Sequence, residues 1–406
     1  MSNRQVVITH GVRTAIGKIG KSLKDKSDIE LGRLVIDELL YKRAKIDPLE
    51  IDQVILGEVK QKADPANIAR VAALDAGVPE SVPCYTVNRQ CGSGLQAIID
   101  AYEMIAAEEA ELIVAGGVEN MSQSVYVMRG VRSGLGNGSC TIEDSLTEGG
   151  PGAIPKERYG YHPMGITAEK LAEIYGLSRE QQDKFALRSQ ERIAAAIQEG
   201  RFTEQIMPVE IEENGTTHVF AVDEHPFLSP LEKLATLKPA FKKDGSVTAG
   251  NSSGRNDGAS AVLVMSEDKM RTLGLAPMAK ILGVGSSGCD PTVMGLGPVE
   301  CSRLALERAG IPLADVDVIE LNEAFAAQSL AVMEEWKKWG VSEEALIEKI
   351  NPNGGAIAHG HPLGCTGSAL TVKCMYELRR RPDARYGLIT LCCAGGLGVA
   401  LVIEKC

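Results

Sequence analysis

Runs of consecutive apolar residues alternate with amphipathic segments along the chain, a pattern that indicates an α/β protein. Residues 112–115 (Leu-Ile-Val-Ala) are one such run, and residues 84–87 (Cys-Tyr-Thr-Val) predict a strand that leads into a glycine-rich turn. Continuous apolar strands are typical of a sheet covered by helices on both faces. Residues 386–403 are uncharged over the length of a membrane span, but glycines divide the run. We therefore predict two strands around a turn there and no membrane span.

The chain contains an internal repeat, in which matching segments occur twice in the same order. The matched pairs are 46–55 with 311–319, Glu58 with Glu323, 86–88 with 349–351, 91–94 with 353–367, and 113–117 with 389–396. The offset between the copies widens toward the C-terminal end, which predicts an insertion in the second half. We expect two related α/β domains, each a sheet flanked by helices.

Residues 122–253 differ in character from both halves and predict a large excursion from the first domain. They contain a Gly/Ser-rich loop at 133–139, amphipathic helices near 168–175 and 179–199, and a polar hairpin at 208–223. Ser178 and Gln181 form a capping-box pattern, and Gly200 is a helix stop signal. The predicted domains are 1–121 with 254–276 (N-terminal core), 122–253 (inserted loop domain) and 277–406 (C-terminal core).

The composition is that of an ordinary globular protein and excludes several classes. Among 406 residues, 44% are hydrophobic and 24% are charged, which excludes intrinsic disorder and fibrous architectures. A net charge of −11 and an aromatic content of 4% argue against a nucleic-acid partner. The ten cysteines show no Cys-x-x-Cys spacing, and the chain starts with no signal peptide or presequence pattern. We expect a cytoplasmic protein with reduced thiols and no metal site.

Cys91 is the first candidate for chemistry, in the segment Asn-Arg-Gln-Cys-Gly-Ser-Gly between a predicted strand and a predicted helix. The positive end of a helix dipole favours a thiolate, and Gly92 and Gly94 allow a substrate to approach closely. A free cysteine is more often a small buried apolar residue. This segment alone leaves both interpretations open.

A nucleophilic cysteine needs a base, and the chain has only six histidines. His359 and His361 lie in a Gly-rich segment that the repeat matches to the Cys91 turn. We therefore expect one of them to face Cys91 across the domain junction. Cys392 lies in a third Gly-rich turn, which could present a thiol and backbone N–H donors to an oxyanion, or could be only a tight hairpin.

Six motifs, taken together and in this order, resemble those of the thiolases. They are Asn-Arg-x-Cys91-Gly-Ser-Gly, Ala115-Gly-Gly-Val-Glu119-Asn-Met-Ser122, Gly250-Asn-Ser-Ser253-Gly, Asn322-Glu-Ala-Phe-Ala326, Gly360-His361-Pro and Cys392-x-x-Gly-Gly-x-Gly398. The resemblance covers essentially the whole chain. It implies a thiolase fold: two pseudo-symmetric βαβαβαββ halves forming a layered αβαβα core, with a loop domain inserted in the first half.

The resemblance also implies an activity, which is reversible Claisen condensation of two acetyl-CoA to acetoacetyl-CoA and CoA. A broad-chain 3-ketoacyl-CoA thiolase of fatty-acid degradation is the alternative. By resemblance, Cys91 accepts the acyl group, His361 activates Cys91, and Cys392 moves a proton at the acetyl α-carbon. Asn322 would hold a water that, together with His361, forms one oxyanion site, and the backbone N–H groups of Cys91 and Ala394 would form the other. Coenzyme A thioesters are then substrates, and no cofactor is expected.

The resemblance places the substrate-binding residues mostly in the loop domain. Because coenzyme A is anionic and the protein is acidic, a local basic patch is expected at Lys233 and Lys238, for which a solvated surface is the alternative. Ser253 would contact the pantetheine arm. The acyl pocket would include Met164, Phe325 and His162. A homo-oligomer, dimer or tetramer, is also implied.

Three departures from the family pattern and two competing functions affect this interpretation. Ala394 stands where the family usually has Gly, and His359 where it usually has Ile or Leu. Acetoacetyl-CoA thiolases typically have His-Met-Gly before the helix near 168, whereas the sequence His-Pro-Met-Gly at 162–165 places His162 one residue early and looks more like the broad-chain thiolases. A ketoacyl-acyl-carrier-protein synthase shares the fold but lacks a cysteine matching Cys392. A non-catalytic member of the superfamily would have lost Cys91, His361 or Cys392. We further expect Cys91 and Cys392 to lie close enough to make the enzyme sensitive to oxidation.

Overall fold

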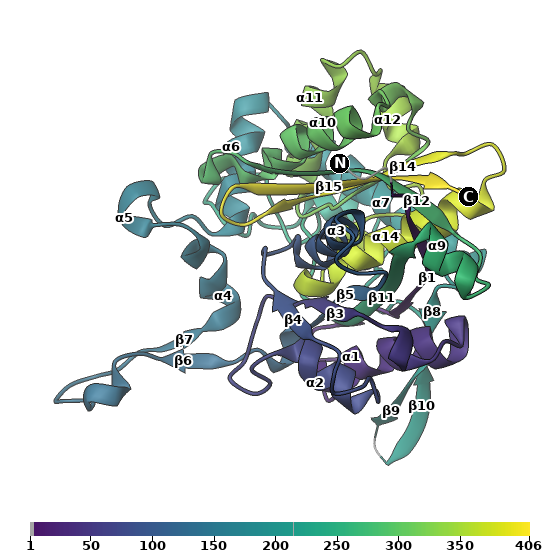
Figure 1. Ribbon diagram of the computed structural model, residues 1–406. Helices are drawn as coiled ribbons and strands as arrows, with labels where there is room; N and C mark the ends of the chain where they lie inside the picture. Colours follow the sequence, from purple (N-terminus) through teal and green to yellow (C-terminus); the bar gives the residue numbers. More distant parts are fainter. Residues whose placement is uncertain (1–3, 214) are drawn as a thin grey trace.

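The computed structural model describes residues 4–213 and 215–406, and its centre is an 11-stranded sheet made from both halves of the chain (Figure 1). The first half contributes five strands in the spatial order β1-β11-β5-β3-β4. They are β1 (Val6–Thr14), β3 (Gln53–Gly57), β4 (Cys84–Val87), β5 (Leu112–Asn120) and β11 (Asn256–Ser266). The short strand β2 (Gly17–Lys18) pairs with β11. The helices of this half are α1 (Asp28–Asp37), α2 (Ile68–Asp75), α3 (Ser93–Ala106) and α9 (Glu267–Thr272).

The second half repeats this arrangement in the order β12-β15-β14-β13. Its strands are β12 (Ala279–Gly288), β13 (Val318–Leu321), β14 (Tyr386–Cys393) and β15 (Leu397–Lys405). Its helices are α10 (Gly297–Ala309), α11 (Ala326–Lys337), α12 (Glu343–Lys349), α13 (Ala356–His359) and α14 (Leu363–Arg380). The counterpart of β4 is reduced to a parallel bridge between Ile350 and Ile319. The predicted pair of βαβαβαββ halves is confirmed.

The predicted αβαβα layering is also confirmed. Helices α1 and α2 cover one outer face, α10, α11 and α12 cover the other, and α3 and α14 lie between the two halves of the sheet (Figure 1). Three hydrophobic cores fill the spaces between these layers. Leu31 of α1 belongs to the first core, Ile98 of α3 to the second and Trp336 of α11 to the third. Strands β1 and β12 join the two halves through only two residue pairs, Val7 with Lys280 and Ile8 with Ala279.

Close packing of α3 on α14 brings the starts of these two helices together. A side chain on Gly94 would meet the carbonyl of Gly364, and one on Gly367 would meet the backbone N of Leu95. Glycine at these two positions allows backbone to approach backbone. Because α3 and α14 are equivalent helices of the two halves, the turns that precede them must also be neighbours. Part of the predicted insertion in the second half lies in the turn before α14, which contains α13.

The excursion begins with an arm made of β6 (Tyr126–Met128) and β7 (Ile142–Asp144). It continues through α4 (Ser145–Gly149), α5 (Lys156–Tyr159), α6 (Met164–Tyr175), α7 (Arg179–Gln198), β8 (Ile206–Met207), β9 (Val209–Glu213), β10 (Thr216–Phe220) and α8 (Leu231–Ala235). The capping box of Ser178 and Gln181 is present at the start of α7, and Gly200 follows its end with a φ of 68°. Strands β9 and β10 form the predicted hairpin, whose residue 214 lies outside the described residues.

Short 3-10 and π-helical turns complete the chain. They are Glu38–Ala44, Pro48–Glu50, Met121–Gln123, Val131–Ser133, Pro151–Ala153, Pro291–Leu296 and Leu313–Asp315. The uncharged segment 386–403 forms β14 and β15, which pair with each other around the glycine turn. In the part of the chain that the structure describes, no helix is long and apolar enough to cross a membrane.

Candidate active site

Three glycine-rich turns from distant parts of the chain meet at one cavity of about 350 Å³. Cys91 reaches it from the turn between β4 and α3, and His361 from the turn between α13 and α14. Cys392 and Ala394 reach it from the end of β14. The structure therefore brings together Cys91, His361 and Cys392, the three side chains singled out from the sequence.

Cys91 lies in a strained and shielded turn. Gln90 before it has a φ of 49°, which is unusual for a residue with a side chain. The backbone N–H groups of Ala394 and Cys91 donate toward Cys91 Sγ, but burial outweighs them and raises the pKa of this thiol to about 11. Desolvation of the charged form thus opposes the effect of the helix start, which favours a thiolate.

His361 is held in one tautomer by the start of its own helix. Its Nδ1 lies 2.7 Å from Thr366 Oγ1, and the Thr366 hydroxyl donates to the carbonyl of Pro362 at 2.8 Å. The hydroxyl oxygen must then accept from Nδ1–H, which leaves Nε2 without a proton. Burial lowers the pKa of His361 to about 4, so its imidazole is neutral near pH 7.

Asn322, directly after β13, points its side chain at Nε2 of His361. Its Nδ2 lies 3.5 Å from His361 Nε2, and its Oδ1 has no hydrogen-bond partner among the described residues. The Asn322 backbone N–H donates to the carbonyl of Thr390 at 3.0 Å, which ties it to β14 next to Cys392. An unpaired amide oxygen beside a neutral imidazole is suited to a bound group, such as a water, that donates a hydrogen bond to it.

Ala394 fits the turn despite replacing a glycine. The left-handed residues of this turn are Gly395 (φ 90°) and Gly396 (φ 76°), whereas Ala394 lies outside that region. Its side chain therefore introduces no backbone strain, and its N–H stays directed at Cys91 Sγ. The alanine leaves the geometry of the second predicted oxyanion site intact.

His359 has a different environment from His361. Its Nε2 lies 3.3 Å from Asp223 Oδ2, and Asp223 makes a bidentate pair with buried Arg13 at 2.7 and 2.9 Å. Its ring also stacks at a tilt on Phe202, with centroids 6.2 Å apart. His359 therefore belongs to a buried network behind the cavity, and only His361 of the two lines the cavity wall.

Of the predicted acyl-pocket and pantetheine residues, Met164, Phe325 and Ser253 line the cavity. The Phe325 ring packs edge-on against Phe241 at 5.9 Å. His162 is not part of the lining, because its Nε2 turns back to the carbonyl of Tyr159 at 2.6 Å.

The two predicted coenzyme A lysines are separated by the structure. Lys233 lines a second, largely apolar cavity of about 260 Å³ together with Lys18 and His225. Lys238 is exposed and lines neither cavity. One short segment borders both cavities, because Gly250 lines the second and residues 252–254 line the first.

Sequence reasoning missed several residues that hold the site in place. Asn256 Oδ1 accepts the backbone N–H of His361 at 2.9 Å. Glu119 accepts backbone N–H groups from Val59, Lys60 and Gly364 at 3.1, 2.9 and 2.7 Å. Glu119 stands in one of the six motifs, which was a signal for a role. Lys60, which lines the cavity, has no local sequence signal because only the folded chain brings it there.

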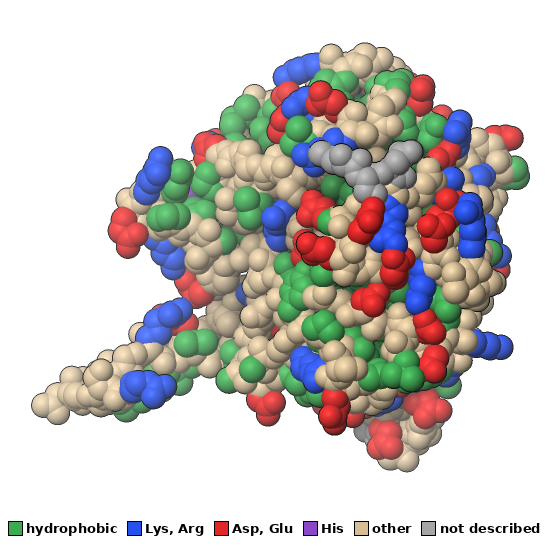
Figure 2. Space-filling model, in the orientation of Figure 1, with side chains coloured by type: hydrophobic (Ala, Val, Ile, Leu, Met, Phe, Trp, Pro, Cys, Tyr) green, Lys and Arg blue, Asp and Glu red, His purple; other side chains and the backbone are tan. Residues whose placement is uncertain are grey.

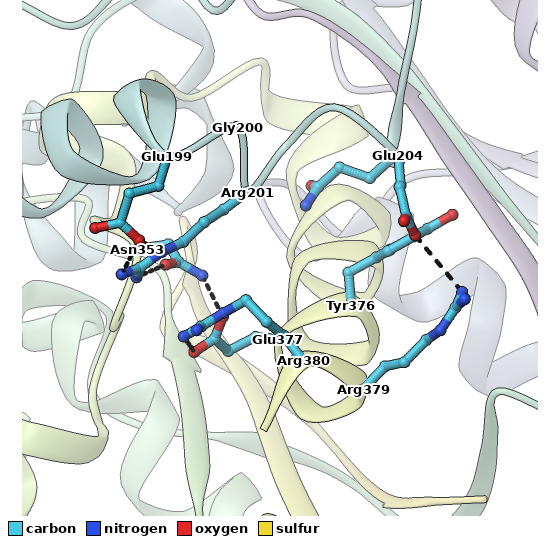
Figure 3. Close-up of a pocket in the computed structure, with 10 residues that line it drawn as sticks. Glu199, Gly200, Arg201, Glu204, Asn353, Tyr376, Glu377, Arg379 and Arg380 are labelled. Carbon is cyan, nitrogen blue, oxygen red and sulfur yellow. Dashed lines mark hydrogen bonds and ion pairs between the residues drawn. The ribbon is translucent and has the colours of Figure 1, made fainter. Parts of the chain in front are cut away.

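Another cavity, of about 340 Å³, lies between α7, the loop around Asn353 and α14 (Figure 3). Its charged side chains are paired with one another: Arg380 with Glu377 at 2.7 Å, Arg201 with Glu199 at 2.6 Å, and Arg379 with Glu204 at 3.7 Å. Its lining contains no cysteine or histidine. None of Cys91, His361 and Cys392 lines this cavity.

Comparison with known proteins agrees with this geometry. The thiolase N-terminal domain model matches residues 6–268, and the thiolase C-terminal domain model matches residues 275–405. Proteins named acetyl-CoA acetyltransferase from Syntrophomonas wolfei and Pseudomonas aeruginosa are 46% and 48% identical, over 99% of this chain and 99% and 100% of theirs.

Two solved structures also share the fold over 99% of both chains. The Bacillus anthracis acetyl-CoA acetyltransferase has a TM-score of 0.93 at 46% identity, and the human mitochondrial 3-ketoacyl-CoA thiolase has 0.92 at 41%. Full-length matches at this identity, together with the shared fold and the converging turns, show that the chain belongs to the thiolase family.

Proposed function

We propose that this protein is an acyltransferase that joins two acetyl-CoA into acetoacetyl-CoA and CoA, and cleaves acetoacetyl-CoA in the reverse direction. The observation that carries the proposal is the convergence of Cys91, His361 and Cys392 on one cavity. Relatives named acetyl-CoA acetyltransferase, with which the chain aligns over nearly its full length, support it. The test is loss of the absorbance of the magnesium enolate of acetoacetyl-CoA when coenzyme A is added.

In the first half-reaction, Cys91 Sγ attacks the carbonyl carbon of acetyl-CoA. Because His361 Nε2 is unprotonated, it takes the Cys91 proton as the carbon–sulfur bond forms. The departing coenzyme A sulfur takes the proton of Cys392, which leaves acetyl-Cys91, a Cys392 thiolate and a protonated His361. This sequence explains how Cys392 becomes a base although burial raises the pKa of its thiol well above the usual value.

In the second half-reaction, the Cys392 thiolate removes a proton from the methyl carbon of a second acetyl-CoA. The enolate oxygen accepts hydrogen bonds from protonated His361 Nε2 and from a water held by the side chain of Asn322, whose Nδ2 lies 3.5 Å from that nitrogen. The enolate carbon attacks acetyl-Cys91, Cys91 leaves as a thiolate, and His361 returns its proton. Each preorganised oxyanion donor is worth about 3–4 kcal/mol in a site shielded from water.

The second oxyanion site would act on the thioester carbonyl bound to Cys91. The N–H groups of Ala394 and Cys91 point at Sγ in the free enzyme, so they are positioned for an oxygen that develops charge on the adjacent carbon. Fixed backbone donors need no reorganisation during the reaction. Acyl transfer through Cys91 then gives ping-pong kinetics.

Coenzyme A would lie across the two adjacent cavities. The thioester end would enter the cavity of Cys91, and the pantetheine arm would pass Ser253. The anionic nucleotide end would then reach the second cavity, where Lys233 and Lys18 supply positive charge. Lys238 is exposed outside both cavities and can reach the nucleotide only from the surface.

A broad-chain 3-ketoacyl-CoA thiolase is the second candidate function. It is favoured by the 41% identity to the human mitochondrial 3-ketoacyl-CoA thiolase and by staphylococcal relatives named probable acetyl-CoA acyltransferase. Thiolysis rates from acetoacetyl-CoA to 3-oxohexadecanoyl-CoA separate the two. A rate that falls steeply beyond the shortest substrate supports the acetyl-specific enzyme.

Self-association, as a dimer or tetramer in the cytoplasm, completes the proposal. The β6–β7 arm projects from the body of the molecule (Figure 2). It carries the exposed apolar side chains Val125, Tyr126, Met128, Val131, Leu135 and Ile142. Several exposed apolar residues on one projecting arm favour contact with another protein surface. Light scattering of the purified protein, with and without residues 126–142, tests this.

A further inference from the structure

Two cationic side chains, Lys60 and Arg255, line the active-site cavity, although most of its wall is apolar. The apolar lining includes Met121, Leu146, Met164, Met294, Phe325 and Leu363. The methyl end of an acetyl group cannot pair with a cation, and an unpaired ammonium is costly to hold away from water. Arg255 is exposed to solvent, but condensation of acetyl-CoA supplies no anionic partner for the acyl-side ammonium of half-buried Lys60.

Lys60 is anchored at both ends of its side chain. Its backbone N–H donates to Glu119 Oε1 at 2.9 Å, directly after strand β3. Its Nζ donates to the carbonyl of Ser145 at 2.5 Å and lies against Gly149, so it reaches the wall formed by α4. The same wall supplies Thr147 to the cavity lining. The ammonium group is thus fixed at the part of the cavity wall formed by α4.

The Lys60 ammonium has hydrogen-bonding capacity to spare. A lysine carries three N–H donors, and only the contact to Ser145 uses one. Within residues 4–213 and 215–406, no carboxylate lies within 4.0 Å of its Nζ. Glu119 is occupied by three backbone N–H groups, and Asp144 by the N–H of Leu146 and the hydroxyl of Thr147.

The charges around Lys60 also favour the binding of an anion beside it. Burial lowers the pKa of Lys60, while Glu119 and Cys91 favour its charged form. A bound carboxylate would compensate the burial of the ammonium and would form short, charge-assisted hydrogen bonds with it. Half-buried Gln90, next to Cys91 in the lining, adds an amide, and exposed Arg255 adds positive potential.

We propose that Lys60 is a specificity-determining residue that selects 3-oxoacyl-CoA substrates whose acyl chain ends in a carboxylate. The proposal rests on the proposed function, because the bond cleaved and the residues that cleave it stay the same. During thiolysis the acyl chain is held on Cys91, and its terminal carboxylate pairs with the Lys60 ammonium on the adjacent wall. The apolar lining then contacts only the methylene groups between the two ends.

A purely structural role for Lys60 makes a different prediction. If Lys60 only ties α4 to the core through Ser145, its loss should loosen the cavity wall and slow every substrate alike. A role in substrate selection should instead change the ratio between two substrates that differ only at the end of the chain. The pair 3-oxoadipyl-CoA and 3-oxohexanoyl-CoA fits this purpose, since they have the same number of acyl carbons.

The experiment measures kcat/KM for thiolysis of both substrates, and of acetoacetyl-CoA, by the full-length protein. The wild type should prefer 3-oxoadipyl-CoA. Lys60→Met should lower the ratio of the two kcat/KM values roughly tenfold to a hundredfold, as expected for loss of a charge-assisted hydrogen bond. Lys60→Arg should keep most of the preference. Lys24→Met, which removes an exposed lysine paired with Asp25, should leave the ratio unchanged.

Each outcome decides one question. A wild type that cleaves acetoacetyl-CoA but prefers 3-oxohexanoyl-CoA overturns the role of Lys60 and leaves the proposed function standing. So does a Lys60→Met variant that slows all three substrates in equal proportion. A wild type that cleaves none of the three overturns the proposed function itself. If Lys60→Met fails to fold, the preference of the wild type and that of Lys60→Arg still decide whether Lys60 selects the substrate.

Discussion

The hydroxyl of Thr366 determines which nitrogen of His361 faces the cavity without a proton. Thr366 Oγ1 lies 2.7 Å from Nδ1, and because this hydroxyl donates to the Pro362 carbonyl, it can only accept from the ring. His361 Nε2 is therefore the basic nitrogen, and Asn322 Nδ2 lies 3.5 Å from it. One threonine in the first turn of α14 thus prepares the base that the proposed mechanism requires.

We predict that Thr366→Val lowers kcat roughly tenfold to a hundredfold, because Nδ1–H loses its acceptor and the tautomer is no longer fixed. Thr371→Val is a matched control: Thr371 is buried in the same helix and its hydroxyl also donates to the carbonyl four residues earlier. Steady-state kinetics on acetoacetyl-CoA measures both. Equal losses in the two variants would show that the effect is one of packing.

Cys91→Ala should abolish acetyl-enzyme formation, whereas Cys392→Ser should still acquire an acetyl group but condense very poorly. The reason is that acyl capture uses Cys91, and Cys392 acts on protons. Intact mass after incubation with acetyl-CoA reports the first step, and exchange of solvent deuterium into acetyl-CoA reports the second. An acetylated Cys91→Ala protein, or exchange at the wild-type rate in Cys392→Ser, would contradict these roles.

His361→Ala and His359→Ala should fail in different ways. His361 lines the cavity, so its loss should lower kcat/KM by several orders of magnitude with little change in stability. His359 lies beside Asp223 and Phe202 in the buried network, so its loss should lower the free energy of unfolding by about 1–3 kcal/mol and spare the chemistry. Kinetics together with urea unfolding of both variants would separate the two.

Glu58→Gln should stabilise the protein at high pH. Burial, reinforced by Asp28 and Glu119, raises the pKa of Glu58 from 4.5 to about 8, and its Oε1 lacks a partner among the described residues. The folded state therefore holds a proton that the unfolded state releases above pH 4.5. This group's contribution to stability is complete below pH 4.5 and falls as the pH rises to about 8.

At pH 9 the free energy of unfolding of Glu58→Gln should exceed that of the wild type by about 1 kcal/mol or more, since the amide has no proton to lose. The difference should shrink toward pH 5. Exposed Glu80→Gln is the control and should show no pH-dependent gain. Urea unfolding at both pH values provides the comparison, and a gain that is the same at pH 5 and pH 9 would refute the titration of Glu58.

Mild oxidation should inactivate the enzyme reversibly, through a disulfide between Cys91 and Cys392 or a sulfenic acid at Cys91. Both thiols line the cavity, and Cys393 Sγ lies against Gly92 beside them. Because burial raises the pKa of Cys91 to about 11, the reaction should speed up with rising pH. Activity and peptide mapping after diamide and then dithiothreitol test this. Full activity after complete oxidation of exposed Cys406 would exclude it.

Much of the architecture could be predicted because it depends on short-range patterns. The repeat of 86–88 in 349–351 reflects the equivalence of β4 with the Ile350 bridge. The capping box at Ser178 and the strand–turn–strand of β14 and β15 each depend on residues that are close together in the sequence. The neighbouring positions of the Cys91 and His361 turns follow from the same repeat, because equivalent helices pack against each other at the centre.

The remaining features were decided only by tertiary structure. His359 and His361 stand two residues apart in the sequence, yet one meets Asp223 and the other meets the cavity. His162 and exposed Lys238 were expected at the substrate but do not line the cavity, while Lys60 lines it without any local signal. Side-chain direction, burial and the pKa shifts that burial causes depend on contacts between residues far apart in the chain. The spacing of residues along a sequence carries no direct information about such contacts.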